Sequence, residues 1–220
     1  MFEPDSPNEP FDDRSDAGTR LAERLLPLAD EDPVIIALPR GGVPVAKEIA
    51  VALGAPLEIL AVRKLGAPAN PEYGIGAVAE DGSCVVDTEV VRQLGIDDDT
   101  LESIIAGETA ELGRRVSAYR GDRPAIGLAG RTVIVVDDGV ATGVTDTAAL
   151  RAVRRQEPRR LILAVPVSAP DSVPSLRTEA DEVVCLSTPP LFYGVGMHYH
   201  DFSQVSDREV VSILEELGER

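Results

Sequence analysis

The chain has 220 residues, which is enough for one well-buried α/β domain and too few for two full domains. Its 21 basic and 38 acidic residues give a formal net charge of −17, which disfavours nucleic acid or an anionic membrane as a partner. No apolar run approaches the ~18 residues that span a bilayer, and the two distant cysteines suggest neither a disulfide framework nor a zinc site.

These features, together with an acidic start that lacks the basic region of a signal peptide, predict a soluble cytoplasmic protein. Only two of the basic residues are lysines, Lys47 and Lys64. Because short carboxylates stay hydrated and their mutual repulsion is screened in concentrated salt, the composition suggests adaptation to a salt-rich cytoplasm.

The first elements of the chain predict a packing scaffold. Residues 1–14 are rich in Pro and Asp and predict a flexible acidic arm, followed by a single domain over 15–220. Leu21, Leu25 and Leu28 recur at helical spacing, so residues 15–28 are expected to form an amphipathic helix without a chemical role. The apolar run 34–38 predicts a strand, and the pattern over 43–53 predicts a helix.

A glycine-rich loop joins this strand to this helix. In it, Arg40, Gly41 and Gly42 follow a proline, and they can offer a guanidinium and backbone N–H groups to a diphosphate. The alternative is an ordinary turn between a strand and a helix.

The next segment contains the second cationic candidates. A strand predicted over 57–62 ends at Arg63 and Lys64, and a weakly periodic segment continues to Asn70 and Pro71. A loop without regular structure in a compact domain is often a lid. Residues 75–78 and 84–86 predict a hairpin after it. Solvated charges at a strand end are the alternative for Arg63 and Lys64. Residues 98–119 carry apolar side chains at helical intervals and predict a long helix.

An acidic turn follows the strand predicted over 133–136. Asp137 and Asp138 come directly after it, and the small residues from Gly139 to Thr145 lead into a helix that is expected to begin near Thr145. The first N–H groups of such a helix form an anion site, and the two carboxylates could accept sugar hydroxyls or hold hydrated Mg²⁺. A plain turn would explain the Asp pair alone, but not the loop that continues it.

Strands over 160–165 and 183–186, with helices over 146–155 and 172–178, continue the alternation and predict a doubly wound, mainly parallel α/β sheet. The stretch 133–145 resembles the 5-phosphoribosyl-1-diphosphate (PRPP) binding motif of type I phosphoribosyltransferases, except that Gly139 stands where the family usually has an aliphatic residue. The loop 38–46 resembles the diphosphate loop of that family, and 64–79 lies in the place of its flexible loop. The end of the long helix resembles one branch of the family, the phosphoribosyltransferase domain proteins, in Arg114, Arg115, Tyr119, Arg120 and Gly121. The alternative is that the cations there only suit the helix dipole, without any ligand.

The resemblance implies roles for particular residues. Asp137 and Asp138 would hold the ribose hydroxyls and hydrated Mg²⁺, while Arg63 and Lys64 would neutralise the departing diphosphate. The 5-phosphate would bind to Ala141, Thr142, Gly143, Val144 and Thr145, and the diphosphate to Arg40, Gly41 and Gly42.

The hood, residues 188–205, contains a group of aromatic side chains in a chain that otherwise has few. Phe192, Tyr193 and Phe202 could stack on the planar base of an acceptor, and type I enzymes form a hood over the acceptor. They could instead close the top of the sheet. His198, His200 and Asp201 lack a third separated ligand, which disfavours a metal site there.

The implied function is Mg²⁺-dependent transfer of ribose 5-phosphate from PRPP to a small-molecule acceptor. Enzymes that act on 6-oxopurines usually carry Asp at the position of Ala141, so this residue disfavours hypoxanthine or guanine. A non-catalytic PRPP- or nucleotide-binding regulator and a phosphosugar hydrolase are the alternatives. A homodimer is one assembly compatible with the sequence.

Overall fold

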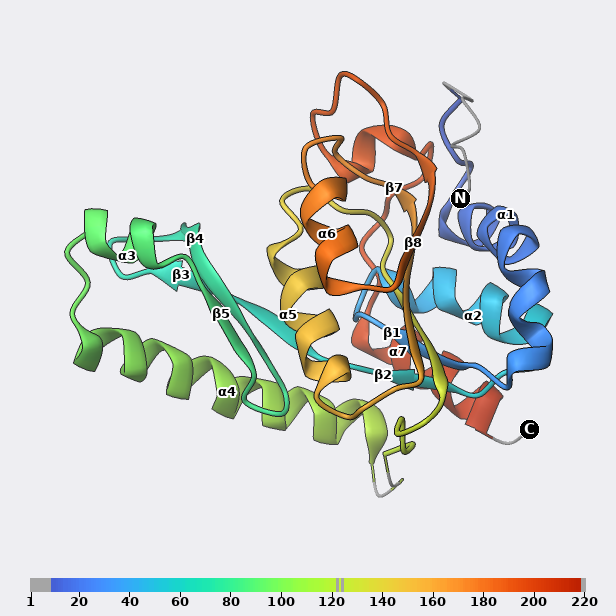
Figure 1. Ribbon diagram of the computed structural model, residues 1–220, viewed down its shortest axis with the longest axis horizontal. Coiled ribbons are helices and arrows are strands. Elements are labelled where there is room, and N and C mark those ends of the chain that lie inside the picture. The colour runs from blue at the N-terminus through green and yellow to red at the C-terminus, as the bar shows by residue number, and fades with distance from the viewer. Residues whose placement is uncertain (1–8, 122, 124, 219–220) are drawn as a thin grey trace.

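The computed structural model describes residues 9–121, 123 and 125–218. In this part of the chain a five-stranded sheet has the order β2-β1-β6-β7-β8, and all neighbouring strands are parallel (Figure 1). The strands are β1 (Val34–Ala37), β2 (Leu57–Ile59), β6 (Thr132–Val136), β7 (Arg160–Val167) and β8 (Glu182–Ser187). The doubly wound parallel α/β fold is confirmed.

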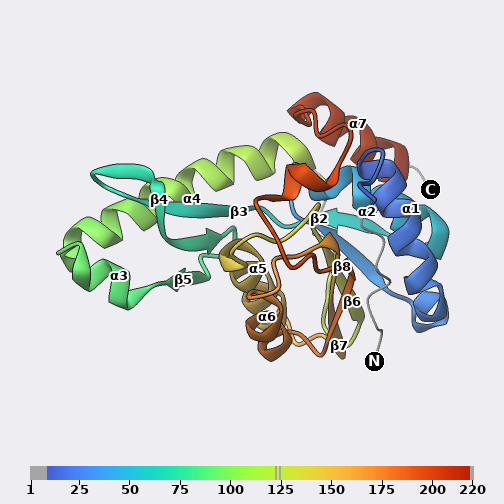
Figure 2. The ribbon, with the colours of Figure 1, turned by 90° about the horizontal axis from the view of Figure 1, so that it is seen from above.

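Both faces of this sheet are covered, which is why its strands are continuous apolar runs. Along β6, Ile134 and Val136 pack into the core on one face, and Val133 and Val135 pack into the core on the other. The covering helices lie on opposite sides of the sheet in Figure 2. They are α1 (Arg14–Leu25), α2 (Gly42–Leu53) and α7 (Asp207–Gly218) on the first face, and α5 (Val144–Arg154) and α6 (Val173–Glu179) on the second.

Helix α1 is shorter than the predicted helix over 15–28. The Asp13 carboxylate caps it by accepting hydrogen bonds from the N–H groups of Ser15 and Asp16. The helix ends at Leu25, and a 3₁₀ helix, η1 (Leu26–Glu31), follows it with a proline in its first turn. The proline has no N–H to continue the α-helical hydrogen bonds, which fits the change of geometry there.

Residues 9–14 are not the loosely held arm that the sequence suggested. Phe11 is buried, its N–H donates to the carbonyl of His198 at 2.8 Å, and its carbonyl accepts from the N–H of His200 at 2.8 Å. The ring of Phe11 also packs at 5.4 Å from the ring of Tyr199. Residues 1–8, the rest of that predicted arm, lie outside the described part of the chain.

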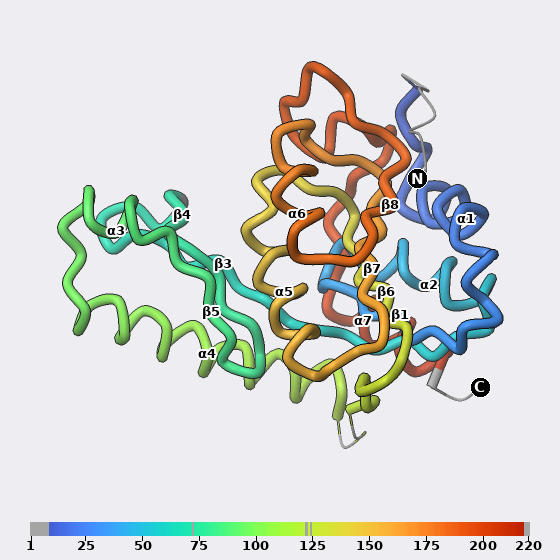
Figure 3. The backbone as a smooth tube through the Cα atoms, viewed as in Figure 1, coloured from blue at the N-terminus to red at the C-terminus, as the bar shows by residue number. Residues whose placement is uncertain are grey.

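A side lobe projects from the main sheet (Figures 1 and 2). It consists of β3 (Val62–Ala67), β4 (Asn70–Ala79), β5 (Cys84–Val86), α3 (Thr88–Gln93) and α4 (Asp98–Arg120). The chain leaves the main sheet after β2 and returns through α4 to β6, as the trace in Figure 3 follows. The lobe has its own core, in which Leu65, Ile75 and Val78 pack with Leu112 of α4.

The side lobe corrects two predictions. The segment 64–79 is not an irregular loop, because it forms most of the antiparallel pair β3–β4. The strand predicted over 57–62 is divided, since β2 ends at Ile59 in one sheet and β3 begins at Val62 in another. The segment contains glycines where strands approach closely: a Cβ on Gly76 would overlap the carbonyl oxygen of Val85. The predicted hairpin is confirmed by β4 and β5.

The predicted long helix is confirmed as α4. Among the described residues, no helix is long and apolar enough to cross a membrane.

Candidate functional site

Two loops meet at the carboxyl ends of the neighbouring strands β1 and β6. Ala37 pairs with Val136, and the N–H of Leu38 donates to the carbonyl of Val136 at 2.9 Å. A Cβ on Gly42 would lie 2.6 Å from that same carbonyl oxygen, and a Cβ on Gly41 would overlap Oδ2 of Asp138. The two loops that the sequence singled out are therefore in direct contact, and the contact leaves room only for glycine at both positions.

The loop after β6 ends in the helix that the sequence predicted. Helix α5 begins at Val144, behind Gly143, whose φ of 73° is the left-handed conformation that favours glycine. Ala141 and Thr142 are exposed ahead of it, and the Ser172 hydroxyl holds the loop by donating to the carbonyl of Ala141 at 2.6 Å. The first-turn N–H groups of a helix have no acceptor within it, so this loop can bind an anion.

The carboxylates of Asp137 and Asp138 lie beside this loop and are largely desolvated. Asp137 accepts a hydrogen bond from the N–H of Asp138 at 2.8 Å. Burial raises the pKa of Asp137 well above its ordinary value, and the charges of Asp138 and Asp146 raise it further. Burial also raises the pKa of Asp138, against the opposing effect of Arg14. Two such carboxylates favour a cation next to them.

The chemistry of the pair suits a hydrated magnesium ion. Among the described residues no group of three or more metal-ligating side chains lies close enough together to hold a metal. Asp137 and Asp138 would offer one or two carboxylate ligands, and water and substrate phosphate would be the other ligands of a bound ion. That mixed set of oxygen ligands is typical of Mg²⁺, which keeps several of its waters in proteins.

Arg14 is the nearby cation that the sequence did not point out. Its Nε donates to Oδ2 of Asp138 at 2.8 Å, and Nη2 lies 2.8 Å from the same oxygen. Its Nη1 donates to the carbonyl of Ser203 at 2.8 Å, and the guanidinium lies 4.0 Å from the ring centre of Phe202. A contact across 124 residues leaves no local pattern, so only the fold reveals it.

Comparison with known proteins identifies the family of the chain. A family model described as the phosphoribosyl transferase domain matches residues 12–200. This chain belongs to the type I phosphoribosyltransferase family. The crystal structure of TT1426 from Thermus thermophilus is 47% identical in sequence, has a TM-score of 0.81, and aligns over 94% of this chain and 99% of its own.

A curated relative in Mycobacterium tuberculosis (strain ATCC 25618 / H37Rv), "Putative phosphoribosyl transferase Rv0571c", is 47% identical over 205 residues. The match covers 93% of this chain and 46% of the relative. This phosphoribosyltransferase-family chain therefore spans about half the length of that relative.

The candidate site contains a further buried acid, Asp146, in the first turn of α5. It is only 3% exposed, and among the described residues its Oδ1 has no hydrogen-bond partner. Burial is the main cause that raises its pKa to about 7. No local pattern indicated this, because an acid in the first turn of a helix is usual there and ordinarily solvated.

The predicted cationic residues of the chain are placed differently. Arg40 stays in the loop after β1, where its Nη1 lies 3.7 Å from Asp207 of α7. Arg63 pairs with Glu108 and Glu111 on α4, so the structure joins it to the side lobe rather than to the Asp pair.

Lys64 is the exposed neighbour of Arg63 on β3. Its side chain lies over Gly74, where a Cβ would overlap the Lys64 Cε. Successive strand residues face opposite sides, which separates Lys64 from Arg63. Their joint role in neutralising diphosphate stays a prediction.

The hood, which includes the 3₁₀ helix η2 (Val195–His198), rests on the acidic motif. The Tyr199 hydroxyl donates to the carbonyl of Asp138 at 2.6 Å, and a Cβ on Gly139 would lie 2.6 Å from Val195 Cγ1. The aliphatic side chain that the family usually has at position 139 would therefore overlap Val195, whereas Gly139 leaves room for it.

The three aromatic residues predicted to bind an acceptor have different surroundings. Phe192 stacks on His198, with ring centres 5.4 Å apart and an interplanar angle of 17°. Tyr193 is 82% exposed, whereas the guanidinium of Arg14 covers one face of the Phe202 ring. A role of Phe192, Tyr193 and Phe202 in acceptor binding stays a prediction.

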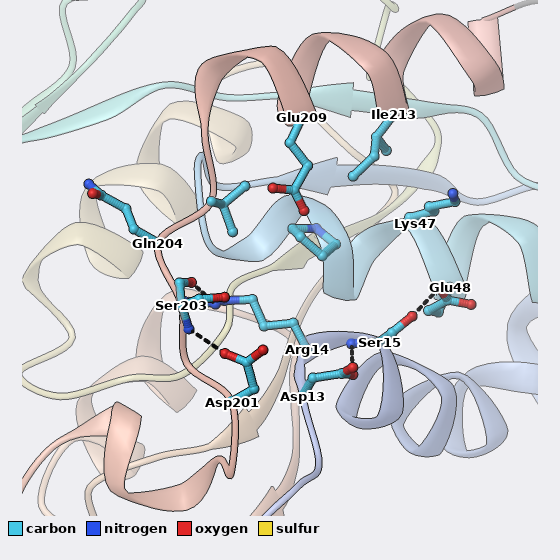
Figure 4. Close-up of a pocket in the computed structure, with 12 residues that line it drawn as sticks. Asp13, Arg14, Ser15, Lys47, Glu48, Asp201, Ser203, Gln204, Glu209 and Ile213 are labelled. Carbon is cyan, nitrogen blue, oxygen red and sulfur yellow. Dashed lines mark hydrogen bonds between the residues drawn. The ribbon is translucent and has the colours of Figure 1, made fainter.

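A cavity of about 380 Å³ lies beside Arg14, which is one of the residues that line it (Figure 4). It lies among the starts of α1 and α2, the hood and α7, and it is lined by both acidic and basic side chains, including Lys47, Glu48 and Glu209. Lys47 is paired with Glu216 at 2.7 Å, and Ser15 donates to Glu48 at 2.5 Å. These contacts account for the charges of Lys47 and Glu48 without a ligand.

Proposed function

We propose that this protein is a Mg²⁺-dependent phosphoribosyltransferase that transfers ribose 5-phosphate from PRPP to a nitrogenous base and releases diphosphate. The observation that supports it most directly is the contact between Gly41 and Asp138. This contact brings the glycine-rich loop that contains Arg40 against the carboxylate pair Asp137 and Asp138, next to the loop that leads into α5 and can bind an anion.

In this proposal each part of PRPP has its own protein partners. The N–H groups from Ala141 to Thr145 bind the 5-phosphate at the start of α5. Asp137 and Asp138 accept hydrogen bonds from the ribose hydroxyls and hold hydrated Mg²⁺. Gly41 and Gly42 allow the diphosphate to approach the backbone, and Arg40 supplies a guanidinium to it.

Catalysis would come from placement and charge. Positive charge develops at the anomeric carbon during transfer, and the buried carboxylates stabilise it from the ribose side. Bound Mg²⁺ would offset negative charge on the diphosphate. Arg40 does the same from the loop after β1, and Lys64 is the proposed cation of the side lobe. The fixed loops hold PRPP so that an acceptor nitrogen can attack in line.

The acceptor is proposed only as a class. Ala141 cannot exchange a proton with a base, which disfavours a 6-oxopurine acceptor. The proposal otherwise includes a small-molecule acceptor, a cytoplasmic location and a protein adapted to salt, with no nucleic acid or membrane partner. A homodimer is compatible with it.

Calorimetric titration of PRPP with Mg²⁺ in high salt tests the donor site. We expect binding to the wild type and its loss in Asp137→Asn/Asp138→Asn, followed by base-dependent release of diphosphate when candidate acceptors are screened. No binding to the wild type would rule out the proposal. Diphosphate release without any base would instead favour a phosphosugar hydrolase.

A non-catalytic PRPP- or nucleotide-binding regulator is the second candidate. The pairing of Arg63 with Glu108 and Glu111 favours it, because a guanidinium held by two carboxylates is not available to diphosphate. In that case PRPP binds as in the first proposal, but no base in the screen yields diphosphate.

A further inference from the structure

We propose that Arg14 is a positioning residue of the PRPP site, which fixes the side chain of Asp138 and fastens the hood to it. This inference rests on the proposed function. It goes beyond it because Arg14 belongs to neither loop that was expected to bind PRPP.

The first argument is how completely Arg14 is engaged. Nε and Nη2 both reach Oδ2 of Asp138, and Nη1 reaches the carbonyl of Ser203, all at 2.8 Å. The side chains of Arg14 and Asp138 are only 11% and 14% exposed. A pair this desolvated holds its geometry far better than a surface ion pair, whose side chains move in water.

The second argument is that the same oxygen of Asp138 also packs against the loop after β1. Its Oδ2 lies where a Cβ of Gly41 would overlap it, so this loop contacts the oxygen that Arg14 holds. Because Oδ2 is engaged by Arg14 and by this loop, we expect Oδ1 to be the oxygen that meets a ribose hydroxyl or a metal ion. Arg14 therefore sets the orientation of Asp138 before any ligand arrives, which is preorganisation.

The third argument is that the hood is fastened at the same point. Arg14 binds the backbone of Ser203 and covers the ring of Phe202, and Tyr199 donates to the carbonyl of Asp138 at 2.6 Å. Figure 4 shows Arg14 reaching from the start of α1 across to Ser203. Asp138 is thus held by its side chain and by its carbonyl, and both holds involve the hood.

Helix α1 offers a matched control for these contacts. Arg20 also pairs with an aspartate, Asp16 at 2.7 Å, and its guanidinium lies 5.3 Å from the ring centre of Phe11. It has the same kinds of contact as Arg14, on the same helix, without reaching Asp138. Its replacement reports the cost of losing such contacts outside the site.

The experiment is calorimetric titration of PRPP with Mg²⁺ into Arg14→Ala, Arg14→Lys and Arg20→Ala, each checked for folding by circular dichroism. We expect Arg14→Ala to weaken binding about 10- to 100-fold, as the loss of a residue that orients a ligand does. Arg14→Lys should recover only part of the affinity, because one ammonium cannot replace a three-way guanidinium contact. Arg20→Ala should bind as the wild type does.

A double-mutant cycle separates positioning from general stability. If Arg14 acts through Asp138, then Arg14→Ala should weaken binding much less in the Asp138→Asn background than in the wild type. An equal loss of PRPP affinity in the two backgrounds would overturn the role of Arg14 and leave the proposed function untouched. Wild-type affinity of Arg14→Ala would do the same. Failure of the wild type to bind PRPP would overturn the proposed function, and this role with it.

Discussion

Replacing Asp146 with Asn should stabilise the protein at neutral and alkaline pH, because it removes a charge that the fold buries. Asp146 is 3% exposed, and burial raises its pKa from 3.8 to about 7. This difference of about three pH units, at about 1.4 kcal/mol per unit, corresponds to a penalty of about 4 kcal/mol for the ionised form. Loss of the charge also removes repulsion that raises the pKa of Asp137.

The sign of the pH dependence follows from linkage. The folded-state pKa of Asp146 lies above its unfolded value, so the folded protein binds more protons between about pH 4 and pH 7. The stabilising contribution of this group to the free energy of unfolding is therefore lost as the pH rises from about 4 to about 7. Above pH 7 the contribution no longer changes with pH. The variant has no such group, so its advantage over the wild type should grow from pH 4 to pH 7.

The amide that replaces the carboxyl offsets part of the gain. An Asn side chain there would lack a partner at the position of Oδ1, which costs about 1–2 kcal/mol. We therefore expect Asp146→Asn to raise the free energy of unfolding by about 2–3 kcal/mol at pH 8 and to be neutral or slightly destabilising at pH 4.

Urea unfolding followed by circular dichroism, at five pH values and constant salt, measures this difference. Asp171→Asn is the control, because it removes the same charge from an exposed position and should change stability by less than about 0.5 kcal/mol. A difference between Asp146→Asn and the wild type that does not change with pH would refute the reasoning, since it would mean that Asp146 is equally ionised in both states.

Three further predictions concern the contacts around Asp138 and the surface charge. Gly41→Ala should abolish PRPP binding, measured by calorimetry, and should destabilise the fold by about 1–3 kcal/mol, since its Cβ would overlap the Asp138 carboxylate. The control is Gly107→Ala, in open space on α4, which should not lower the affinity for PRPP. Wild-type affinity of Gly41→Ala would contradict the contact. Tyr199→Phe should cost about 1 kcal/mol in urea unfolding through the lost hydrogen bond to the carbonyl of Asp138, whereas an unchanged midpoint would mean that water replaces it. Because the net charge is −17, the thermal midpoint should rise steadily from low to molar KCl, and equal stability at both ends would exclude salt adaptation.

The fold was predictable from the sequence wherever a local pattern specifies it. The run from Val133 to Val136 is buried on both faces, and the turn from Asp137 to Gly143 leads directly into α5, so strand, motif and helix could all be placed without tertiary information. The side lobe was less predictable. In β3 and β4 the alternation of side chains is interrupted by Gly66, Gly74 and Gly76. The segment is regular because its strands pair with each other and with β5, and the sequence does not display this pairing.

The candidate site was predictable in its two loops and not in what surrounds them. Arg14 lies in a segment whose local composition suggested a loose arm, and its partner is 124 residues away. Asp146 looks like any acid at the start of a helix until the packing of α5 buries it. Both residues matter through long-range contacts or burial, which residue types and spacing alone do not encode.

The proposed function requires a site for a polyanion in a strongly acidic chain. The surface field opposes the approach of a diphosphate, but its range is only about 8 Å at physiological ionic strength and shorter in concentrated salt. In the proposed site the short-range groups are Arg40, the N–H groups at the start of α5, and two carboxylates that favour a cation. Arg14 already offsets the charge of Asp138, so a metal ion that arrived with PRPP would meet one compensated carboxylate and one, Asp137, that burial makes costly to ionise. We therefore expect these short-range groups to determine affinity and the surface charge to affect mainly the rate of PRPP association.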